Sequence, residues 1–123
     1  MSRGLDHIVH AVRDLNAASA LYRALGFTVG ARNRHPWGTH NHIVQLPGFF
    51  IELLTVAEPE KLGGEGFAAL FGRFNQAFLA RQQGLSFLML EGQNATADAR
   101  DFAAAGIAGS ARLRSSSMRV TTR

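Results

Sequence analysis

The chain carries one short pattern twice, and this repeat constrains the fold more than any other feature of the sequence. Gly84 follows Gly4 by eighty residues, and each glycine opens an alternating apolar stretch, a small polar residue, a helical stretch with one aromatic, and a second glycine. The matching pairs are Gly4 and Gly84, Leu5 and Leu85, Asp14 and Asn94, Tyr22 and Phe102, Ala24 and Ala104, and Gly26 and Gly106. Recurrence in register indicates a duplicated supersecondary unit.

The first copy predicts a strand, a helix and three further strands. Residues 5–12 alternate between two faces, which is typical of a strand. Asp14 is suited to cap a helix over residues 15–25, and Gly26 is suited to end it. Further strands are expected at residues 27–33, 42–46 and 49–56, with residues 34–41 as a loop. The first unit, residues 4–56, is therefore βαβββ.

The second half predicts an incomplete copy. Residues 57–66 form a polar, glycine-rich linker, and residues 67–83 carry helical spacing of apolar side chains that favours a packing face. That apolar stripe consists of Phe67, Leu70, Phe71, Phe74 and Phe78. A strand at 84–92 and a helix at 94–106 follow, and the partial second unit spans 84–110. The basic tail, 111–123, leaves little room for three more strands.

Composition supports a single domain, and the predicted helices and strands place it in the α+β class. With 123 residues and 46% hydrophobic side chains, one modest core is expected. The absence of cysteine excludes disulfides and thiolate metal sites. The sequence shows neither a membrane-spanning apolar run nor a secretory signal, so no membrane partner is expected and the expected location is cytoplasmic.

The net charge of +4 comes from the tail, because the other nine basic residues balance nine acidic ones. The four tail cations are Arg112, Arg114, Arg119 and Arg123. The body shows no basic stripe interleaved with aromatics, so no nucleic-acid partner is expected.

The sequence resembles the vicinal oxygen chelate superfamily in three motifs, namely "LDHIVHAVRDL" (5–15), "LYRALGF" (21–27) and "FIELL" (50–54). This superfamily includes glyoxalase I, the bleomycin resistance proteins and the extradiol dioxygenases. The longer stretch "RHPWGTHNHIVQLPGFFIELL" is similar in particular to bacterial glyoxalase-like domain proteins. The resemblance covers residues 4 to about 107. It implies that each module curls a mixed sheet into a half-barrel with helices on the outer face, and that two modules enclose a cavity.

Glu52 is the most informative single residue, because a carboxylate inside the apolar run 49–56 is costly to bury without a partner. The resemblance implies that Glu52 shares a divalent metal ion with His7, and that Glu52 doubles as a base. Zn, Ni, Mn and Fe(II) suit such a donor pair. His35 and His40 are candidates for a third ligand, since catalytic zinc usually has three. Phe87, at the position of His7 in the second copy, cannot bind a metal.

Two functions are compatible with these residues. One is a metal-dependent lyase, isomerase or dioxygenase acting on a small oxygenated molecule. The other is a metal-free protein that binds a small molecule, like the bleomycin resistance members, with His7 and Glu52 as a hydrogen-bonded pair. The candidate substrate pocket consists of Trp37, Thr39, Asn41 and Phe50.

The incomplete second unit predicts a homodimer, because a short half-barrel exposes sheet edges and apolar surface. The cavity would lie within the chain or between the first modules of two chains. The abrupt change of composition at the tail also suggests a third possibility, namely an abnormal chain end produced by a frameshift or an incomplete open reading frame.

Overall fold

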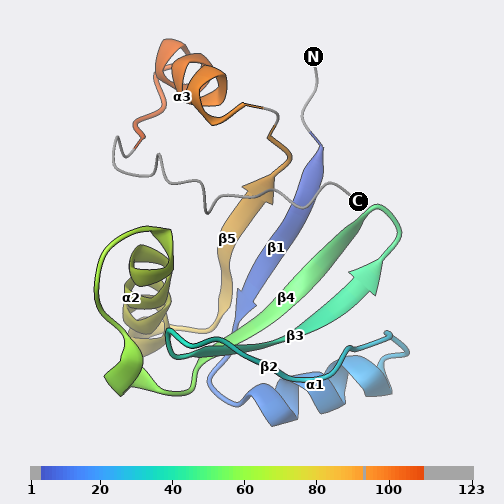
Figure 1. Ribbon diagram of the computed structural model, residues 1–123. Coiled ribbons are helices and arrows are strands. Elements are labelled where there is room, and N and C mark those ends of the chain that lie inside the picture. The colour runs from blue at the N-terminus through green and yellow to red at the C-terminus, as the bar shows by residue number, and fades with distance from the viewer. Residues whose placement is uncertain (1–3, 93, 110–123) are drawn as a thin grey trace.

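A five-stranded mixed sheet with three α-helices forms the domain in the computed structural model, which describes residues 4–92 and 94–109 (Figure 1). The strands are β1 (Leu5–Ala11), β2 (Asn33–Arg34), β3 (Thr39–Leu46), β4 (Phe49–Val56) and β5 (Gly84–Leu90). The helices are α1 (Leu15–Ala24), α2 (Phe67–Arg81) and α3 (Ala95–Ala104), with a short 3₁₀ helix at Pro59–Lys61. The predicted α+β class and mixed sheet are confirmed.

The strand order β2-β3-β4-β1-β5 places β1 at the junction between the two repeats. β1 runs parallel to β4 and antiparallel to β5, which opens the second copy. β3 and β4 form a hairpin whose turn contains Gly48 at a φ of 82°, a conformation that favours glycine. The sheet is therefore open, with β2 and β5 as its edges.

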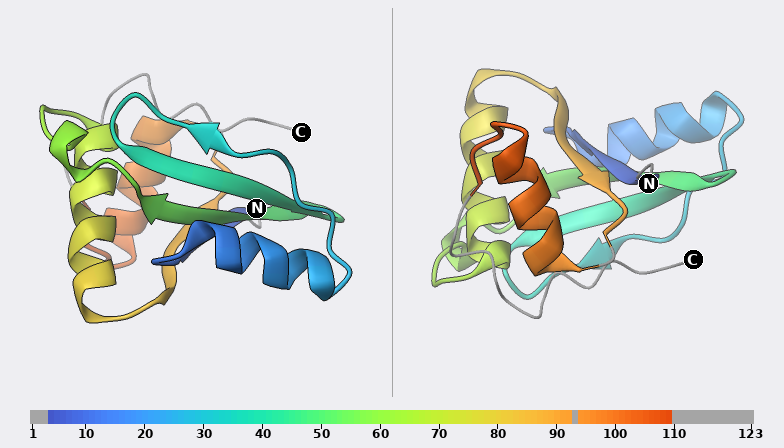
Figure 2. Two further views of the ribbon diagram at one scale, coloured as in Figure 1. Left: turned by 90° about the horizontal axis from the view of Figure 1, so that it is seen from below. Right: turned by 90° about the horizontal axis from the view of Figure 1, so that it is seen from above.

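α1 and α2 pack against opposite faces of the sheet. α1 covers β3 and β4, where Leu15 and Val12 join Val44 and Leu53 in one buried cluster. α2 brings Phe71 onto Val9 and Leu54, whose side chains point the other way. Figure 2 shows α1 running alongside the strands and α2 at one end of the sheet. We call the face that α2 contacts the inner face; it is the face on which Glu52, two residues from Leu54 in β4, also lies.

The first module differs from the sequence prediction in its second and third strands. The strand expected at 27–33 is wrong in extent, because only Asn33–Arg34 and a single bridge from Val29 to Val44 pair with β3. β3 begins at Thr39 rather than at residue 42, so part of the expected loop is strand. Alternating side chains continue through Thr39, His40 and Asn41, and β4 supplies partners along the whole length of this extension.

The second copy reproduces the local structure of the first. Asn94 caps α3 by accepting from Ala97 N, as Asp14 caps α1 by accepting from Ala17 N. α3 has no buried residue and lies beyond the end of β5 (Figure 1). Residue 110, the last of the expected second unit, and the basic tail, 111–123, lie outside the described residues.

The stripe along α2 is only partly buried. Phe71 and Phe78 are buried, whereas Leu70 and Phe74 are 38% and 43% exposed. None of the described helices is long and apolar enough to span a membrane.

Candidate functional site

The structure brings His7 and Glu52 together on the inner face. β1 and β4 are parallel neighbours in which Val9 pairs with Glu52, so His7 lies one side-chain position along the same face. His7 Nε2 is 3.6 Å from Glu52 Oε1, and the two side chains are 14% and 12% exposed. The carboxylate in the apolar run therefore faces inward, towards an imidazole.

Asn41 holds the other oxygen of Glu52. Its Nδ2 donates to Glu52 Oε2 at 2.6 Å, and its own Oδ1 accepts from Asn33 Nδ2 at 2.9 Å. Hydrogen bonds to an ionised acceptor are shorter and stronger than neutral ones, which offsets part of the cost of burying the carboxylate. The hydrogen bonds from Asn33 in β2 to Asn41 in β3, and from Asn41 to Glu52 in β4, thus fix the orientation of the Glu52 carboxylate and leave Oε1 facing His7.

Asp6 and Phe50 hold the His7 ring from two sides. Asp6 Oδ2 lies 2.6 Å from His7 Nδ1, and the Phe50 ring stacks on the imidazole at 4.3 Å with an interplanar angle of 9°. Burial lowers the pKa of His7, but hydrogen bonds and charge from Glu52 and Asp6 outweigh it, and the pKa is raised above its ordinary value. Sequence reasoning missed Asp6, because strand alternation places it on the face opposite to His7.

His35, Trp37 and Thr39 contact one another at the start of β3. His35 Nδ1 lies 2.8 Å from Thr39 Oγ1, and its ring stacks on Trp37 at 4.6 Å. Burial lowers the pKa of His35, and the charge of Glu52 acts in the opposite direction. Thr39 is fully buried and Trp37 is 37% exposed. Thr39 pairs with Val56 of β4, and of the predicted pocket residues Asn41 is the one that bonds Glu52.

The structure does not bring His40 to this site. His40 lies between Thr39 and Asn41 in β3, and alternation turns its side chain to the face of α1. There His40 Nε2 contacts Glu58 Oε1 at 2.8 Å, and Arg32 Nε donates to His40 Nδ1 at 3.1 Å. The prediction of His40 as a third ligand for His7 and Glu52 conflicts with this placement. Both nitrogens of His40 are already used on the other face.

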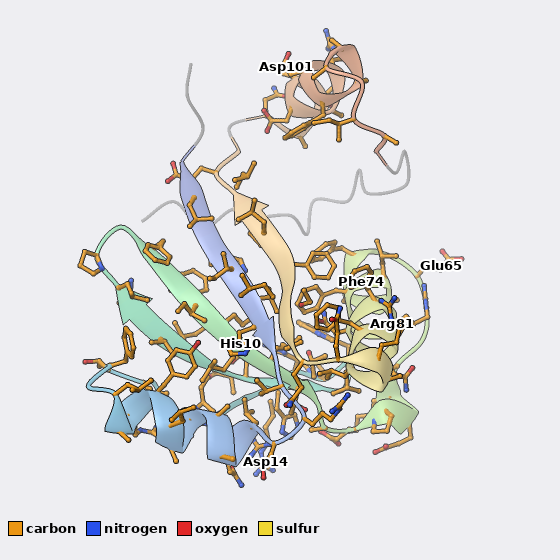
Figure 3. The ribbon with its side chains drawn as sticks, turned by 180° about the vertical axis from the view of Figure 1, so that it is seen from behind. His10, Asp14, Glu65, Phe74, Arg81 and Asp101 are labelled. Carbon is orange, nitrogen blue, oxygen red and sulfur yellow. The ribbon has the colours of Figure 1, made fainter. Side chains whose placement is uncertain are left out.

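The second histidine of β1, His10, also faces α1 (Figure 3). Its Nδ1 lies 2.9 Å from the hydroxyl of Tyr22, as expected for a helix-facing histidine. On β5, Phe87 pairs with Val9 and packs against Phe71 and Phe74, with centroid distances of 5.0 and 4.7 Å. The position that corresponds to His7 in the second copy is therefore part of an aromatic cluster.

The donor pair fits two adjacent ligands of one divalent ion. Metal bonds to imidazole nitrogen and carboxylate oxygen of about 2.0–2.2 Å place neighbouring donors roughly 3.0–3.6 Å apart, which agrees with the 3.6 Å between His7 Nε2 and Glu52 Oε1. Within residues 4–92 and 94–109, no group of three His, Cys, Asp or Glu side chains is arranged to hold a metal. A bound ion would take its other ligands from water or substrate oxygens.

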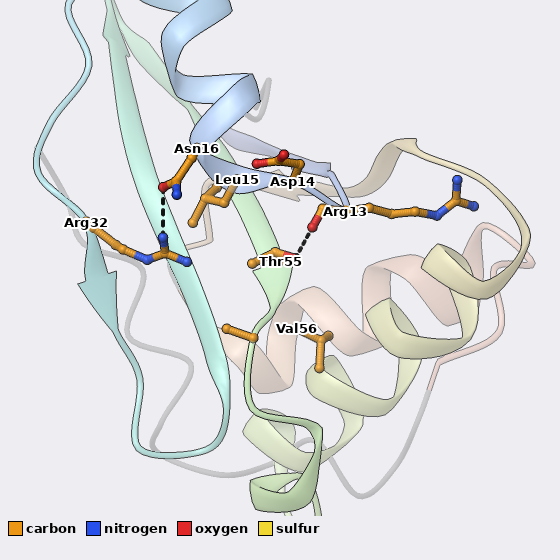
Figure 4. A pocket seen from close by; sticks show the side chains of 8 residues that line it. Arg13, Asp14, Leu15, Asn16, Arg32, Thr55 and Val56 are labelled. Carbon is orange, nitrogen blue, oxygen red and sulfur yellow. Dashed lines mark hydrogen bonds between the residues drawn. The ribbon is translucent and has the colours of Figure 1, made fainter.

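A cavity of about 410 Å³ lies on the other side of the sheet, at the start of α1 (Figure 4). Arg32 Nη1 donates to Asn16 Oδ1 at 3.0 Å across it, and Thr55 Oγ1 donates to the carbonyl of Arg13 at 3.3 Å. Its lining is Arg13, Asp14, Leu15, Asn16, Arg32, Thr55, Val56 and Ala57. Because Thr55 and Glu52 point to opposite faces of β4, this cavity is separate from the His7–Glu52 site.

Comparisons with solved structures give the same fold with low sequence identity. Methylmalonyl-CoA epimerase from Mycobacterium tuberculosis matches with a TM-score of 0.58 and 23% identity, covering 84% of this chain and 64% of that one. A methylmalonyl-CoA epimerase in complex with methylmalonyl-CoA and NH4+ matches with a TM-score of 0.61 and 23% identity, covering 86% of this chain and 72% of that one.

A hypothetical protein from Bacillus halodurans matches with a TM-score of 0.63 and 18% identity, covering 86% of this chain and 70% of that one. The chain thus spans just under two thirds of the mycobacterial epimerase. No curated protein matches the sequence. The model of the glyoxalase-like domain matches residues 5–123. The chain therefore belongs to the glyoxalase-like domain family.

Proposed function

We propose that this domain is a metal-dependent isomerase that moves a proton at the carbon next to a carbonyl of a small oxygenated acid or its thioester. The observation that carries the proposal is the inward-facing pair of His7 and Glu52, 3.6 Å apart on the inner face. The structural neighbours that are methylmalonyl-CoA epimerases support the choice of isomerase, since an epimerase removes and returns a proton at one carbon.

His7, Glu52 and Asn41 have different roles in the proposed reaction. His7 Nε2 and Glu52 Oε1 are the ligands for one divalent ion, for which Zn, Ni, Mn and Fe(II) remain the candidates. Such an ion, when bound, supplies Lewis-acid polarisation of the substrate carbonyl. Glu52 is also the candidate base, and Asn41 keeps its carboxylate in a fixed orientation by donating to Oε2. A base fixed by a neighbour loses little freedom when it meets its substrate.

Trp37 and Phe50 supply the apolar walls of the proposed pocket. Both are partly exposed and both stack on a site histidine, Trp37 on His35 and Phe50 on His7. Small-molecule sites commonly combine aromatic walls with a few placed polar groups. A substrate would lie with its carbon skeleton between these rings and its oxygens towards Glu52.

The alternative is a metal-free binding protein, and two observations favour it. The aromatic Phe87 stands where the second copy would need a ligand, packed against Phe71 and Phe74. Asn41 already satisfies one oxygen of Glu52 without any cation. In this case His7 and Glu52 would position the polar end of a sequestered ligand.

Metal content separates the two functions. We would measure the metal bound to untagged protein by mass spectrometry, for wild type and for Glu52→Gln. Glu58→Gln is the matched control, because Glu58 also contacts a histidine, His40, but on the other face. Near-stoichiometric metal in wild type and in Glu58→Gln, with loss in Glu52→Gln, supports the isomerase. Wild type that stays empty after incubation with Zn, Ni, Mn and Fe(II) supports the binding protein.

We also propose that the chain forms a homodimer. β5 is an edge strand of the described sheet, and Leu85 and Leu88 on it are 64% and 63% exposed. Unpaired edges with apolar side chains are usually covered by another chain. Light scattering at micromolar concentration tests this, and a monomeric mass would contradict it.

A further inference from the structure

We infer that Asp6 is a positioning residue of the site: a β-bulge in β1 turns its carboxylate onto His7 Nδ1 and leaves His7 Nε2 facing Glu52. The purpose of this arrangement rests on the proposed function, since an oriented Nε2 matters only if that atom binds a cation or handles a proton. The geometry itself is independent of that function.

The bulge explains how two consecutive strand residues reach the same side of the sheet. In a regular strand, neighbours point to opposite faces. In the β1–β5 pairing, however, Leu5 is opposite Leu90 and His7 is opposite Met89, so Asp6 is an extra residue in β1. The β1–β4 pairing begins only at His7, so Asp6 lies outside both ladders. Bulges of this kind are common beside active sites, where they redirect a side chain.

The contact between Asp6 and His7 assigns the ring proton. An ionised carboxylate only accepts hydrogen bonds, so at 2.6 Å from Asp6 Oδ2 the nitrogen Nδ1 must carry hydrogen. The neutral ring then has its lone pair on Nε2, which is the atom 3.6 Å from Glu52 Oε1. Metal-binding histidines commonly donate their second ring N–H to a carboxylate in this way, which fixes the tautomer and the ring orientation.

Phe50 and Asp6 restrain different motions of the same ring. The stack on Phe50, with 9° between the planes, fixes the plane of the imidazole. It does not distinguish the two orientations related by a half-turn about the Cβ–Cγ bond. Asp6 makes that distinction, because a half-turn would replace Nδ1 by a carbon at the carboxylate. Together the two contacts place Nε2 in one position.

His42 is an internal comparison for this assignment. His42 Nδ1 lies 2.8 Å from the backbone carbonyl of Gly30, which also only accepts, so His42 carries the same tautomer without a carboxylate partner. Its side chain lies on the other face from Glu52, because His42 and Asn41 are consecutive residues of β3.

Ring-nitrogen NMR and zinc binding test the inference in Asp6→Ala and Asp6→Asn. In metal-free wild type in alkaline buffer, we expect His7 with hydrogen on Nδ1. Asp6→Ala should shift His7 towards the Nε2–H form and leave the spectrum of His42 unchanged. Zinc affinity measured by calorimetry should fall about 10–100-fold in Asp6→Ala. Asp6→Asn, whose amide oxygen still accepts, should retain the tautomer and lose less affinity.

Asp14→Asn is the matched control, since Asp14 accepts from Ala17 N as a helix cap and asparagine caps equally well. It should change neither readout. Wild-type His7 in the Nε2–H form, or a tautomer that Asp6→Ala leaves unchanged, would overturn the inference. If the tautomer responds as expected but wild type binds no zinc, the positioning role of Asp6 stands and the metal-dependent function fails. If Asp6→Ala does not fold, two results still test the inference. The tautomer of His7 in wild type must be the Nδ1–H form, and zinc affinity must be lower in Asp6→Asn than in wild type and Asp14→Asn; an unchanged affinity would overturn the positioning role.

Discussion

The hydrogen bond between Asn41 and Glu52 should contribute substantially to the free energy of unfolding. Asn41 and Glu52 are 5% and 9% exposed, and the 2.6 Å contact joins an amide donor to a carboxylate. Asn41→Ala removes the donor that the carboxylate uses on Oε2. Hydrogen bonds to charged groups contribute about 1.5–3 kcal/mol, and a buried acceptor left without a donor costs a similar amount. We therefore expect Asn41→Ala to lower the free energy of unfolding by about 2 kcal/mol.

A double-mutant cycle isolates this interaction from the loss of packing. Urea unfolding of metal-free wild type, Asn41→Ala, Glu52→Ala and the double variant gives four free energies of unfolding. Because the two side chains are in contact, their effects should not add, and the coupling energy should be about 1.5–3 kcal/mol. Asn33→Ala is a useful control, since Asn33 is exposed and water can replace its bond to Asn41.

Additivity within about 0.3 kcal/mol would refute the reasoning, because distant, independent sites add to within that range. Such a result would mean that the carboxylate of Glu52 finds another donor or reaches water when Asn41 is absent. A coupling energy of the expected size would show that Asn41 supports the charge that the proposed metal site requires.

Three further results are expected. Leu53→Ala should cost about 2–5 kcal/mol in urea unfolding, because Leu53 is fully buried under α1; a loss below about 1 kcal/mol would contradict that packing. Because the pKa of His7 is raised, protonated His7 stabilises the metal-free protein fully below the ordinary histidine pKa, and this stabilisation is lost as pH rises through the raised pKa. NMR titration of His7 checks this. A titration midpoint at or below that of a free histidine would argue against it. Hydrogen bonds from Lys61 and then from His40 lower the pKa of Glu58 to about 2, so its contribution is present above the ordinary glutamate pKa and is lost as pH falls towards 2. Glu58→Gln should flatten this part of the stability profile in acid unfolding, and an unchanged profile would count against the role of Glu58.

Local patterns in the sequence predicted the elements well where one residue pattern decides the conformation. The strand at 49–56, the helix that Asp14 caps and the helix that Asn94 caps all appear in the structure. The strand at 27–33 was wrong in extent because its pairing depends on β3, which lies elsewhere in the chain. Sequence reasoning also placed Glu52 beside His7 correctly, through the family resemblance and not through spacing alone.

The residues around His7 and Glu52 were harder to predict. His35 and His40 were equal candidates, and only the alternation of β3 around its true start at Thr39 separates them. His40 lies with Arg32 and Glu58 on the face of α1, whereas His35 contacts Thr39 and stacks on Trp37. Chain position alone does not tell which residues of a loop turn inward.

The sequence by itself determined the duplicated strand–cap–helix unit and the presence of one carboxylate among apolar neighbours. These features follow from period, capping and turn chemistry within a few residues. Only the tertiary structure decided three contacts: Asn41 donates to Glu52, Phe87 packs against Phe71 at the position that corresponds to His7 in the second copy, and Asp6 contacts His7. Each of these depends on how one strand is registered against another. A bulge of one residue, such as that at Asp6, reverses the face of a side chain without leaving a signal in the sequence pattern.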